Sequence, residues 1–277
     1  MNVSQRSVFQ SFKFDPRLKQ PIALRPTQAG VFLRILLAGI KAVSMLPTQV
    51  FMNRLKVDCN ERIVEIPFVL QCIVPTQGMK ILDFGCVESV IPLYFATLGA
   101  QVVGSDLRDY EFEHPNLVFK KGDFLENDFP DAAFDAVVAV SAVEHSGLDV
   151  YGSKVYERGD ERVLEEFRRV LKPKGLLALT VAFGIPLVTR DLRIYDSNGL
   201  DQLTWGFTIR KREFFRKSET GSYWFRCREE VAGGARFDPI TGVHGVALLL
   251  CEKPDQARAI PEGKRDAVSF PLTEEIA

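Results

Sequence analysis

The chain has 277 residues, of which 46% are hydrophobic and 26% are charged. This length and composition suit one soluble domain with an attached extension, and they exclude a chain too polar to bury a core. The formal net charge is -1, so no strong positive field directs the protein towards nucleic acid or anionic lipid.

Five cysteines are spread along the chain, and no two of them form a CxxC pair. The sequence therefore contains neither a zinc motif nor a dithiol redox motif. Unpaired thiols are typical of reducing compartments, so we expect a cytoplasmic protein whose cysteines are reduced.

Residues 1–60 precede the regular part of the sequence, and we interpret them as an N-terminal helical extension. An apolar run over 31–46 is interrupted by Arg34 and Lys41, which excludes a membrane-spanning helix. The run is typical of an amphipathic helix that packs on the following domain and caps its cleft. Contact of residues 28–46 with a membrane surface is the alternative interpretation.

The segments that follow alternate between helical and extended patterns. Amphipathic patterns predict helices over residues 61–73, 89–99 and 160–171, and a further helix after Asp196. Short apolar runs predict buried parallel strands over residues 79–85, 101–107, 116–123, 134–143 and 176–184. A closing antiparallel pair is predicted for residues 207–215 and 245–253.

Strands that alternate with helices predict an α/β fold with helices on both faces of the sheet. We therefore expect a Rossmann-like, doubly wound, seven-stranded sheet that is mostly parallel and has an antiparallel last strand. This domain spans residues 61–254 and carries the N-terminal helical cap. The polar residues 255–277 form a C-terminal tail.

Polar residues end successive strands of the predicted sheet, where open parallel sheets bind their ligands. In the first turn, Asp83 can accept from an ammonium group, and Gly85 lets the backbone approach a ligand. Asp106 ends the second strand and can accept both hydroxyls of a ribose. After the third strand, Asp123 can accept from an adenine amino group while Phe124 covers the ring. Each feature alone also occurs in ordinary turns and helix caps, but together and in order they indicate one binding site.

The run from Lys80 to Gly184 resembles the class I S-adenosylmethionine-dependent methyltransferases, in particular the type 11 group that acts on small molecules. ILDFGC is similar to their first motif, VVGSDL to the acid motif of the second strand, and KGDF to the adenine motif. FDAVVAVSAVEH and FRRVLKPKGLLALTV are similar to the motifs of the fourth and fifth strands. The resemblance implies S-adenosylmethionine as the cofactor and methyl transfer as the activity.

The resemblance also assigns residues to the parts of the cofactor. The methionine end takes the first turn, with Asp83, Gly85, Cys86 and Glu88. The ribose and the adenine take the second and third strand ends, with Asp106, Leu107, Asp123 and Phe124. Ser141, after the fourth strand, is a further candidate for binding the cofactor, at the place where the acceptor would meet it.

The first motif departs from the family pattern at two positions. The family usually has a second glycine where this chain has Val87, and often a third where it has Ser89. A β-branched residue at positive φ is costly, so we expect the turn to use ordinary φ values. The alternative is weak cofactor binding, which would make the protein a non-catalytic methyltransferase-fold partner or binding protein.

The residues Glu144 and His145 follow the fourth strand and are the candidate catalytic residues. Methyl transfer is an in-line displacement in which the protein supplies orientation and excludes water. An oxygen acceptor also benefits from a general base, and an imidazole suits proton transfer near neutral pH. His145 is therefore a base or a structural side chain that holds the loop. Glu144 is a substrate contact or the partner in a salt bridge.

Other partners and cofactors are less compatible with the sequence. Some relatives bind a divalent ion through ExxEH, but here Ser141 replaces the first acid, so we expect no metal. Methyltransferases of nucleic-acid bases often carry a proline-rich motif where this chain has SAVE, so we expect a small-molecule acceptor. The absence of GxGxxG argues against a nicotinamide oxidoreductase. Three tyrosines are candidates either for the acceptor pocket or for simple packing: Tyr151, Tyr156 and Tyr195.

Overall fold

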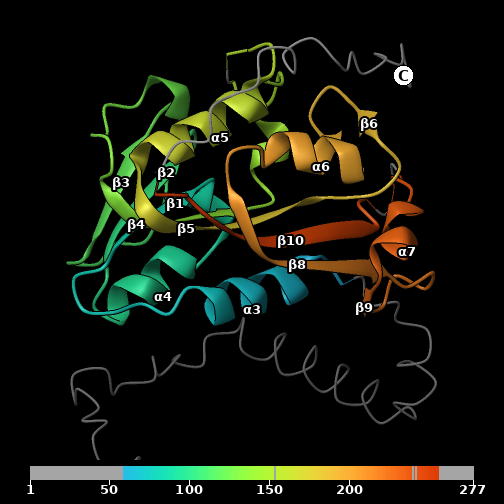
Figure 1. Ribbon diagram of the computed structural model, residues 1–277, viewed down its shortest axis with the longest axis horizontal. Helices are drawn as coiled ribbons and strands as arrows, with labels where there is room; N and C mark the ends of the chain where they lie inside the picture. Colours follow the sequence, from blue (N-terminus) through green and yellow to red (C-terminus); the bar gives the residue numbers. More distant parts are fainter. Residues whose placement is uncertain (1–58, 153, 239, 241, 256–277) are drawn as a thin grey trace, which may run out of the picture. The chain divides into compact units, whose positions relative to one another are not determined.

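The computed structural model describes residues 59–152, 154–238, 240 and 242–255 (Figure 1). Most of the predicted extension over 1–60 and of the tail over 255–277 lies outside the described residues, so these boundaries remain predictions. None of the helices within the described ranges has the length and apolar content needed to span a bilayer.

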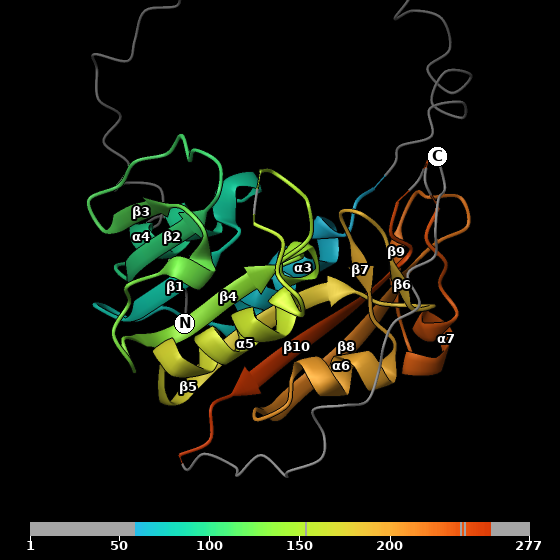
Figure 2. The ribbon, with the colours of Figure 1, turned by 90° about the horizontal axis from the view of Figure 1, so that it is seen from above.

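The described residues form an eight-stranded sheet and a small hairpin of β6 (Leu187–Val188) and β7 (Arg193–Ile194). In spatial order the sheet consists of β3 (Leu117–Lys121), β2 (Gln101–Asp106), β1 (Lys80–Phe84), β4 (Phe134–Val140), β5 (Leu171–Ala182), β10 (Gly245–Glu252), β8 (Thr208–Lys217) and β9 (Trp224–Cys227). Strands β1 to β5 run parallel, and β10 is antiparallel to both β5 and β8 (Figure 2). The predicted doubly wound architecture is confirmed, and the antiparallel edge strand β9 adds one strand to the predicted seven.

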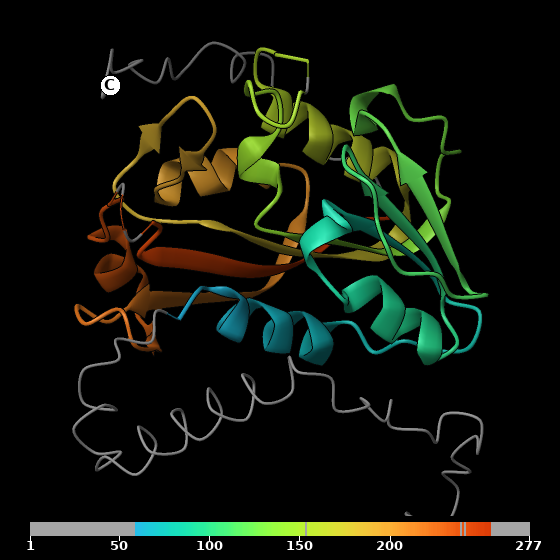
Figure 3. The same cartoon turned by 180° about the vertical axis from the view of Figure 1, so that it is seen from behind.

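Helices cover both faces of the sheet (Figures 1 and 3). One face carries α3 (Arg62–Cys72) and α4 (Ile91–Thr97), and the other carries α5 (Gly159–Val170) and α6 (Ser197–Leu203). The short α7 (Glu229–Gly233) packs beside β8. Short 3-10 helices follow β1, β3 and β4 directly: η2 (Cys86–Glu88), η3 (Phe124–Glu126) and η4 (Val143–His145).

The strand sequences explain this layered arrangement. Side chains alternate between the two faces of a strand, so neighbouring apolar residues enter different cores. Ile81 and Val138 pack with α3 and α4, whereas Leu82 and Val137 pack with α5. All four are fully buried, which is why β1 and β4 read as continuous apolar runs and occupy the centre of the sheet.

The order of the strands places a crevice between β1 and β4. From β1 the chain proceeds outward to β2 and β3, and it then returns to add β4 and β5 on the opposite side of β1. The connections after β1 and β4 therefore diverge, and a doubly wound sheet binds ligands at this divergence. The candidate residues of the first and fourth strand ends meet there.

Two strand boundaries differ from the prediction for physical reasons. β4 ends at Val140 and not at residue 143, because Ser141 takes a left-handed φ of 41°. β5 begins at Leu171 and not at residue 176, because its pairing with β4 shifts register and absorbs the extra residues as a bulge. Lys172 Nζ lies 2.6 Å from Asp135 Oδ1 at this irregularity and ties the two strands together.

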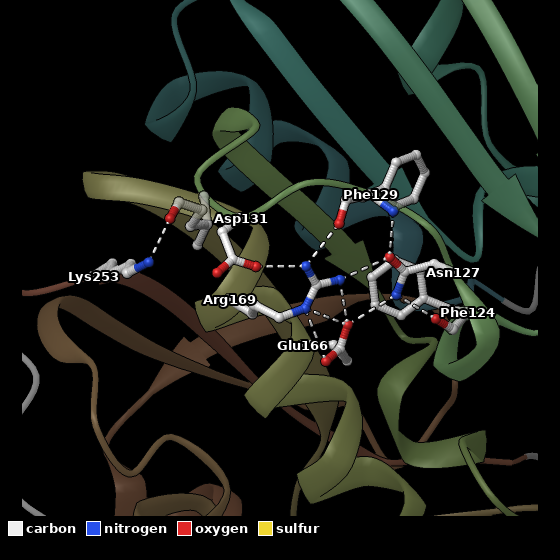
Figure 4. A network of polar contacts seen from close by, with 8 residues as sticks. Phe124, Asn127, Phe129, Asp131, Glu166, Arg169 and Lys253 are labelled. Atoms are coloured by element: carbon white, nitrogen blue, oxygen red, sulfur yellow. Dashed lines mark hydrogen bonds and ion pairs between the residues drawn. The ribbon is translucent and has the colours of Figure 1, made fainter.

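Arg169, in the last turn of α5, holds the connection between β3 and β4 (Figure 4). Its guanidinium donates to the carbonyl oxygen of Phe129 at 2.7 Å and to Asp131 Oδ1 at 2.8 Å. It also donates to Asn127 Oδ1 at 3.0 Å and to Glu166 Oε2 at 2.8 Å. One side chain thus fixes the segment that follows the third strand end onto α5.

We expect the variant Arg169→Gln to lower the free energy of unfolding by about 1–3 kcal/mol, because several acceptors lose a charged donor. Urea denaturation of the wild-type and variant proteins measures the difference. Glu165→Gln is the matched control, since Glu165 lies exposed on the same helix and its loss should change stability by less than about 0.5 kcal/mol. Equal effects of the two variants would show that the Arg169 contacts contribute no stability.

Candidate functional site

A cleft opens at the carboxyl ends of β1, β2, β3 and β4. It encloses about 860 Å³, counting the part open to solvent. Most of the predicted site residues line it: Gly85, Glu88, Asp106, Leu107, Asp123, Phe124, Ser141 and His145. The side chains of Asp83, Cys86 and Glu144 are instead buried and are not among the residues that line the cleft.

The turn after β1 is built around Gly85. Its φ is 70°, and a Cβ at this position would lie 2.4 Å from Ala142 Cβ in the loop after β4. Val87 follows in η2 and is not among the described residues with positive φ, as predicted. Its N–H donates to Asp106 Oδ2 at 3.0 Å. This geometry removes the steric reason for expecting weak cofactor binding.

Cys86, which is predicted to lie at the methionine end of the cofactor, has a buried side chain that is not among the residues lining the cleft. The sulfur is fully buried and lies 2.9 Å from the position that a Cβ on Gly104 of β2 would occupy. Burial and the neighbouring carboxylates Asp83 and Asp106 raise the pKa of the Cys86 thiol far above its ordinary value. The thiol therefore stays protonated and packs the first turn against β2.

Asp106 is held firmly at the end of β2. Besides the Val87 bond to Oδ2, its Oδ1 accepts from the backbone N–H of Arg108 at 3.0 Å and from Arg108 Nε at 3.3 Å. Arg108 Nη1 lies 2.6 Å from Glu88 Oε1 across the cleft wall. A carboxylate has about four acceptor sites, so the fixed Asp106 keeps capacity for a ligand hydroxyl. Sequence reasoning missed Arg108, although it follows the acid by two residues.

The third strand end combines a helix cap with an open space. Asp123 Oδ1 accepts from the backbone N–H of Leu125 at 3.0 Å and caps η3, while Oδ2 accepts from the Tyr156 hydroxyl at 2.9 Å. Gly122 also lines the cleft, and a Cβ there would meet no atom within 4 Å. Phe124 is mostly buried, with its ring centre 5.1 Å from that of Phe84. The cleft is thus open beside Gly122 and Asp123.

A buried series of polar contacts joins the loop after β4 to α3. The Ser141 hydroxyl donates to Glu65 Oε1 at 2.6 Å, and Glu65 Oε2 lies 2.8 Å from Arg62 Nη1. Glu65 is fully buried, and burial raises its pKa although Arg62 opposes the shift. Arg62 lines the cleft. Sequence reasoning missed both α3 residues; the one available signal was a charged pair three residues apart in an otherwise apolar helix.

Asp83 sits behind the first turn and is 2% exposed. Within the described part of the chain, its Oδ2 is buried without a hydrogen-bond partner. Burial raises the pKa of Asp83 well above its ordinary value, and Arg62 partly opposes this shift. An unpartnered buried carboxylate is costly, so the position fits a cationic donor such as the ammonium group predicted there.

His145 lines the cleft, and a hydrogen bond to the segment between β6 and β7 orients its ring. Its Nδ1 hydrogen-bonds the backbone carbonyl oxygen of Asp191, which can only accept. Nδ1 is therefore protonated, and Nε2 is the nitrogen that carries the lone pair when the ring is neutral. Arg193 of β7 supports the same loop, since its Nη1 donates to the carbonyl oxygens of Glu144 at 3.4 Å and Ser146 at 2.7 Å. No sequence motif marked this hairpin.

Glu144 fills neither of its two predicted roles. It is 1% exposed, and its Oε1 accepts from the backbone N–H of Ala182 at 3.2 Å. Among the described residues, its Oε2 has no hydrogen-bond partner and no cation forms a salt bridge with it. Burial raises the pKa of Glu144 to about 7. The carboxyl group thus hydrogen-bonds the last residue of β5 inside the protein.

The three candidate tyrosines divide between the cleft and the core. Tyr151 and Tyr156 line the cleft, and the Arg108 guanidinium lies 4.2 Å from the centre of the Tyr151 ring. Tyr195 is 2% exposed and donates to Asp160 Oδ2 at 2.8 Å, so it belongs to the core and not to an acceptor pocket. The described residues contain no group of three or more His, Cys, Asp or Glu side chains that could hold a metal ion.

The chain is similar to known methyltransferases over its central part. A family profile described as "Methyltransferase domain" matches residues 82–179. A sterol 24-C-methyltransferase from Yarrowia lipolytica is 34% identical over 114 residues, which are 37% of this chain and 27% of that protein. A sterol 24-C-methyltransferase from Aspergillus fumigatus is 36% identical over 115 residues, which are 37% of this chain and 28% of that protein. The chain thus spans just over a quarter of the length of these relatives.

Solved structures also resemble the chain. A methyltransferase from Methanosarcina mazei, described as dependent on S-adenosylmethionine, superposes with a TM-score of 0.48 at 16% sequence identity. The superposition covers 72% of this chain and 100% of that chain.

The buried carboxyl of Glu144 generates a prediction for the pH dependence of stability. Its pKa is raised from 4.5 to about 7, so the folded protein keeps a proton that the unfolded chain releases. This group therefore makes the protein less stable as pH rises from 4.5 to about 7. Between these pH values the free energy of unfolding should fall less in the variant Glu144→Gln than in the wild-type protein. We expect the two decreases to differ by on the order of 1–3 kcal/mol.

Urea titrations at several pH values across this window measure the effect, with the exposed Glu165→Gln as the control. The control should follow the wild-type pH dependence. If Glu144→Gln follows it as well, the carboxyl of Glu144 does not hold a proton in the folded state.

Proposed function

We propose that the protein transfers a methyl group from S-adenosylmethionine to a small-molecule acceptor, because residues 82–179 match the profile described as "Methyltransferase domain". The observation that carries this proposal is the shared cleft: Gly85, Asp106 and Asp123 line it together with His145. Groups suited to a nucleoside and a group suited to proton transfer thus face the same space.

The described residues fit the cofactor part by part. The part of the cleft lined by Gly122 and Asp123 suits the adenine, and the fixed carboxylate of Asp106 suits a ribose hydroxyl. The unpartnered oxygen of Asp83 suits the ammonium group of the methionine end. When bound, S-adenosylmethionine supplies a methyl group activated by its positive sulfur. The protein supplies orientation, so that the acceptor approaches in line with the bond that breaks.

His145 is the proposed general base for an oxygen acceptor. Its Nδ1 proton is held by the carbonyl oxygen of Asp191, which leaves the Nε2 lone pair to accept a proton. As the acceptor oxygen gains the methyl group, its own proton moves to Nε2, and the product leaves without a net charge on the oxygen. The hairpin of β6 and β7 supports this function by fixing the ring and its tautomer.

A carbon acceptor is the second candidate, and the similarity to two sterol 24-C-methyltransferases favours it. The same base serves this reaction, because a carbon centre that gains a methyl cation must lose a proton to restore a neutral product. Incubation with S-adenosylmethionine labelled with ¹³C in the methyl group and a panel of alcohols, phenols and alkenes tests the proposal. Mass spectrometry detects the product, and the ¹³C chemical shift distinguishes an O-methyl from a C-methyl group.

We expect His145→Ala to lower turnover by on the order of 10²–10⁴ while the affinity for S-adenosylhomocysteine stays within about twofold, because only proton transfer is lost. Single-turnover kinetics and calorimetry measure the two quantities. Val150→Ala is the control, since Val150 lines the cleft without an ionisable group. Full turnover by a folded His145→Ala variant would return this histidine to a structural role.

A further inference from the structure

Arg62 has hydrogen-bonding capacity that the described protein does not use. Its Nη1 donates to Glu65 Oε2 at 2.8 Å and to the carbonyl oxygen of Val140 at 3.0 Å. Nε and Nη2 form no hydrogen bond with any of the described residues. The side chain is 23% exposed and lines the cleft. The edge of the guanidinium formed by Nε and Nη2 is therefore available to a ligand.

We propose that Arg62 binds the carboxylate at the amino-acid end of the cofactor, and that Glu65 and Ser141 are the residues that position it. This inference rests on the proposed function, because it assigns one more contact to the same cofactor. Arg62 lies on α3, outside the residues matched by the family profile.

The chemistry of the guanidinium selects the ligand group. Nε and Nη2 are parallel donors whose spacing matches the two oxygens of a carboxylate, so they bind it through two hydrogen bonds. Asp83, whose Oδ2 has no partner among the described residues, interacts electrostatically with Arg62. The first turn thus offers a buried oxygen without a partner, and α3 offers an unused pair of donors that face the cleft. An α-amino acid, which carries one ammonium and one carboxylate, satisfies both.

The polar chain behind Arg62 explains how the guanidinium is aimed. Glu65 uses one oxygen for Arg62 and the other for the Ser141 hydroxyl, so the carboxylate cannot rotate freely. The Val140 carbonyl fixes Nη1 from a second direction. Ser141, which lines the cleft and is predicted to bind the cofactor, thus also positions Arg62 through Glu65.

The test compares two ligands that differ only in the carboxylate: S-adenosylhomocysteine and its decarboxylated amine analogue. Calorimetry gives the ratio of their affinities for the wild-type protein and for Arg62→Gln. We expect the wild-type protein to prefer S-adenosylhomocysteine by about 10- to 100-fold, as a charge-assisted pair of hydrogen bonds provides. In Arg62→Gln the ratio should fall to about one, with the affinity for the analogue little changed.

Two further variants make the result specific. Arg62→Lys keeps a positive charge opposite the buried Glu65, so this variant should fold even if Arg62→Gln does not. It should also reduce the ratio of the two affinities, because lysine lacks the paired Nε and Nη2 donors of arginine. Arg210→Gln alters an arginine of β8 that is not among the residues lining the cleft, and it should leave the ratio unchanged.

An unchanged ratio in folded Arg62→Gln and Arg62→Lys would overturn the assignment and would direct Arg62 to an acidic group of the acceptor instead. If the wild-type protein binds S-adenosylhomocysteine without preferring it over the analogue, the assignment fails while the proposed function stands. If the wild-type protein binds neither ligand, the proposed function itself fails.

Discussion

The close approach of two turns at the centre of the sheet is the constraint on which the cleft depends. The turn after β1 passes so near the loop after β4 that a Cβ on Gly85 would lie 2.4 Å from Ala142 Cβ. Only glycine also accepts the φ of 70° without strain. This contact fixes the first turn, which donates to Asp106 through Val87. The same contact also holds the loop that carries His145. The part of the cleft proposed for the cofactor and the part proposed for proton transfer are therefore fixed relative to each other.

Buried charge links α3 to this centre. The burial of Glu65 and Asp83 is costly, and Arg62 partly offsets the cost for both. The helix therefore does more than cover apolar surface, since its Arg62 and Glu65 form hydrogen bonds with residues at the end of β4. Apolar residues of similar size often stabilise a fold as well as a buried ion pair does, so stability alone does not account for this pair.

The sequence predicted the sheet and the strand-end positions because both depend on local patterns. Alternating apolar runs marked the strands, and motif order marked Asp106 and Asp123, which line the cleft. The hydrogen bond between Ser141 and Glu65 joins residues 76 positions apart, and no local pattern encodes such a contact. Glu144 was misinterpreted for the same reason: its neighbour His145 faces the cleft, but the 3-10 turn directs Glu144 into the core. The edge strand β9 was missed because it is only four residues long.

A crystal structure of the protein with S-adenosylhomocysteine tests the central claim, that this cleft holds the cofactor in one orientation, most directly. We expect the adenine beside Gly122 and Asp123, the ribose hydroxyls on Asp106, and the amino-acid end near Asp83 and Arg62. The thioether sulfur should then point towards the region of the cleft lined by His145. A ligand bound in the reverse orientation, or outside the cleft, would contradict the assignment of these strand ends.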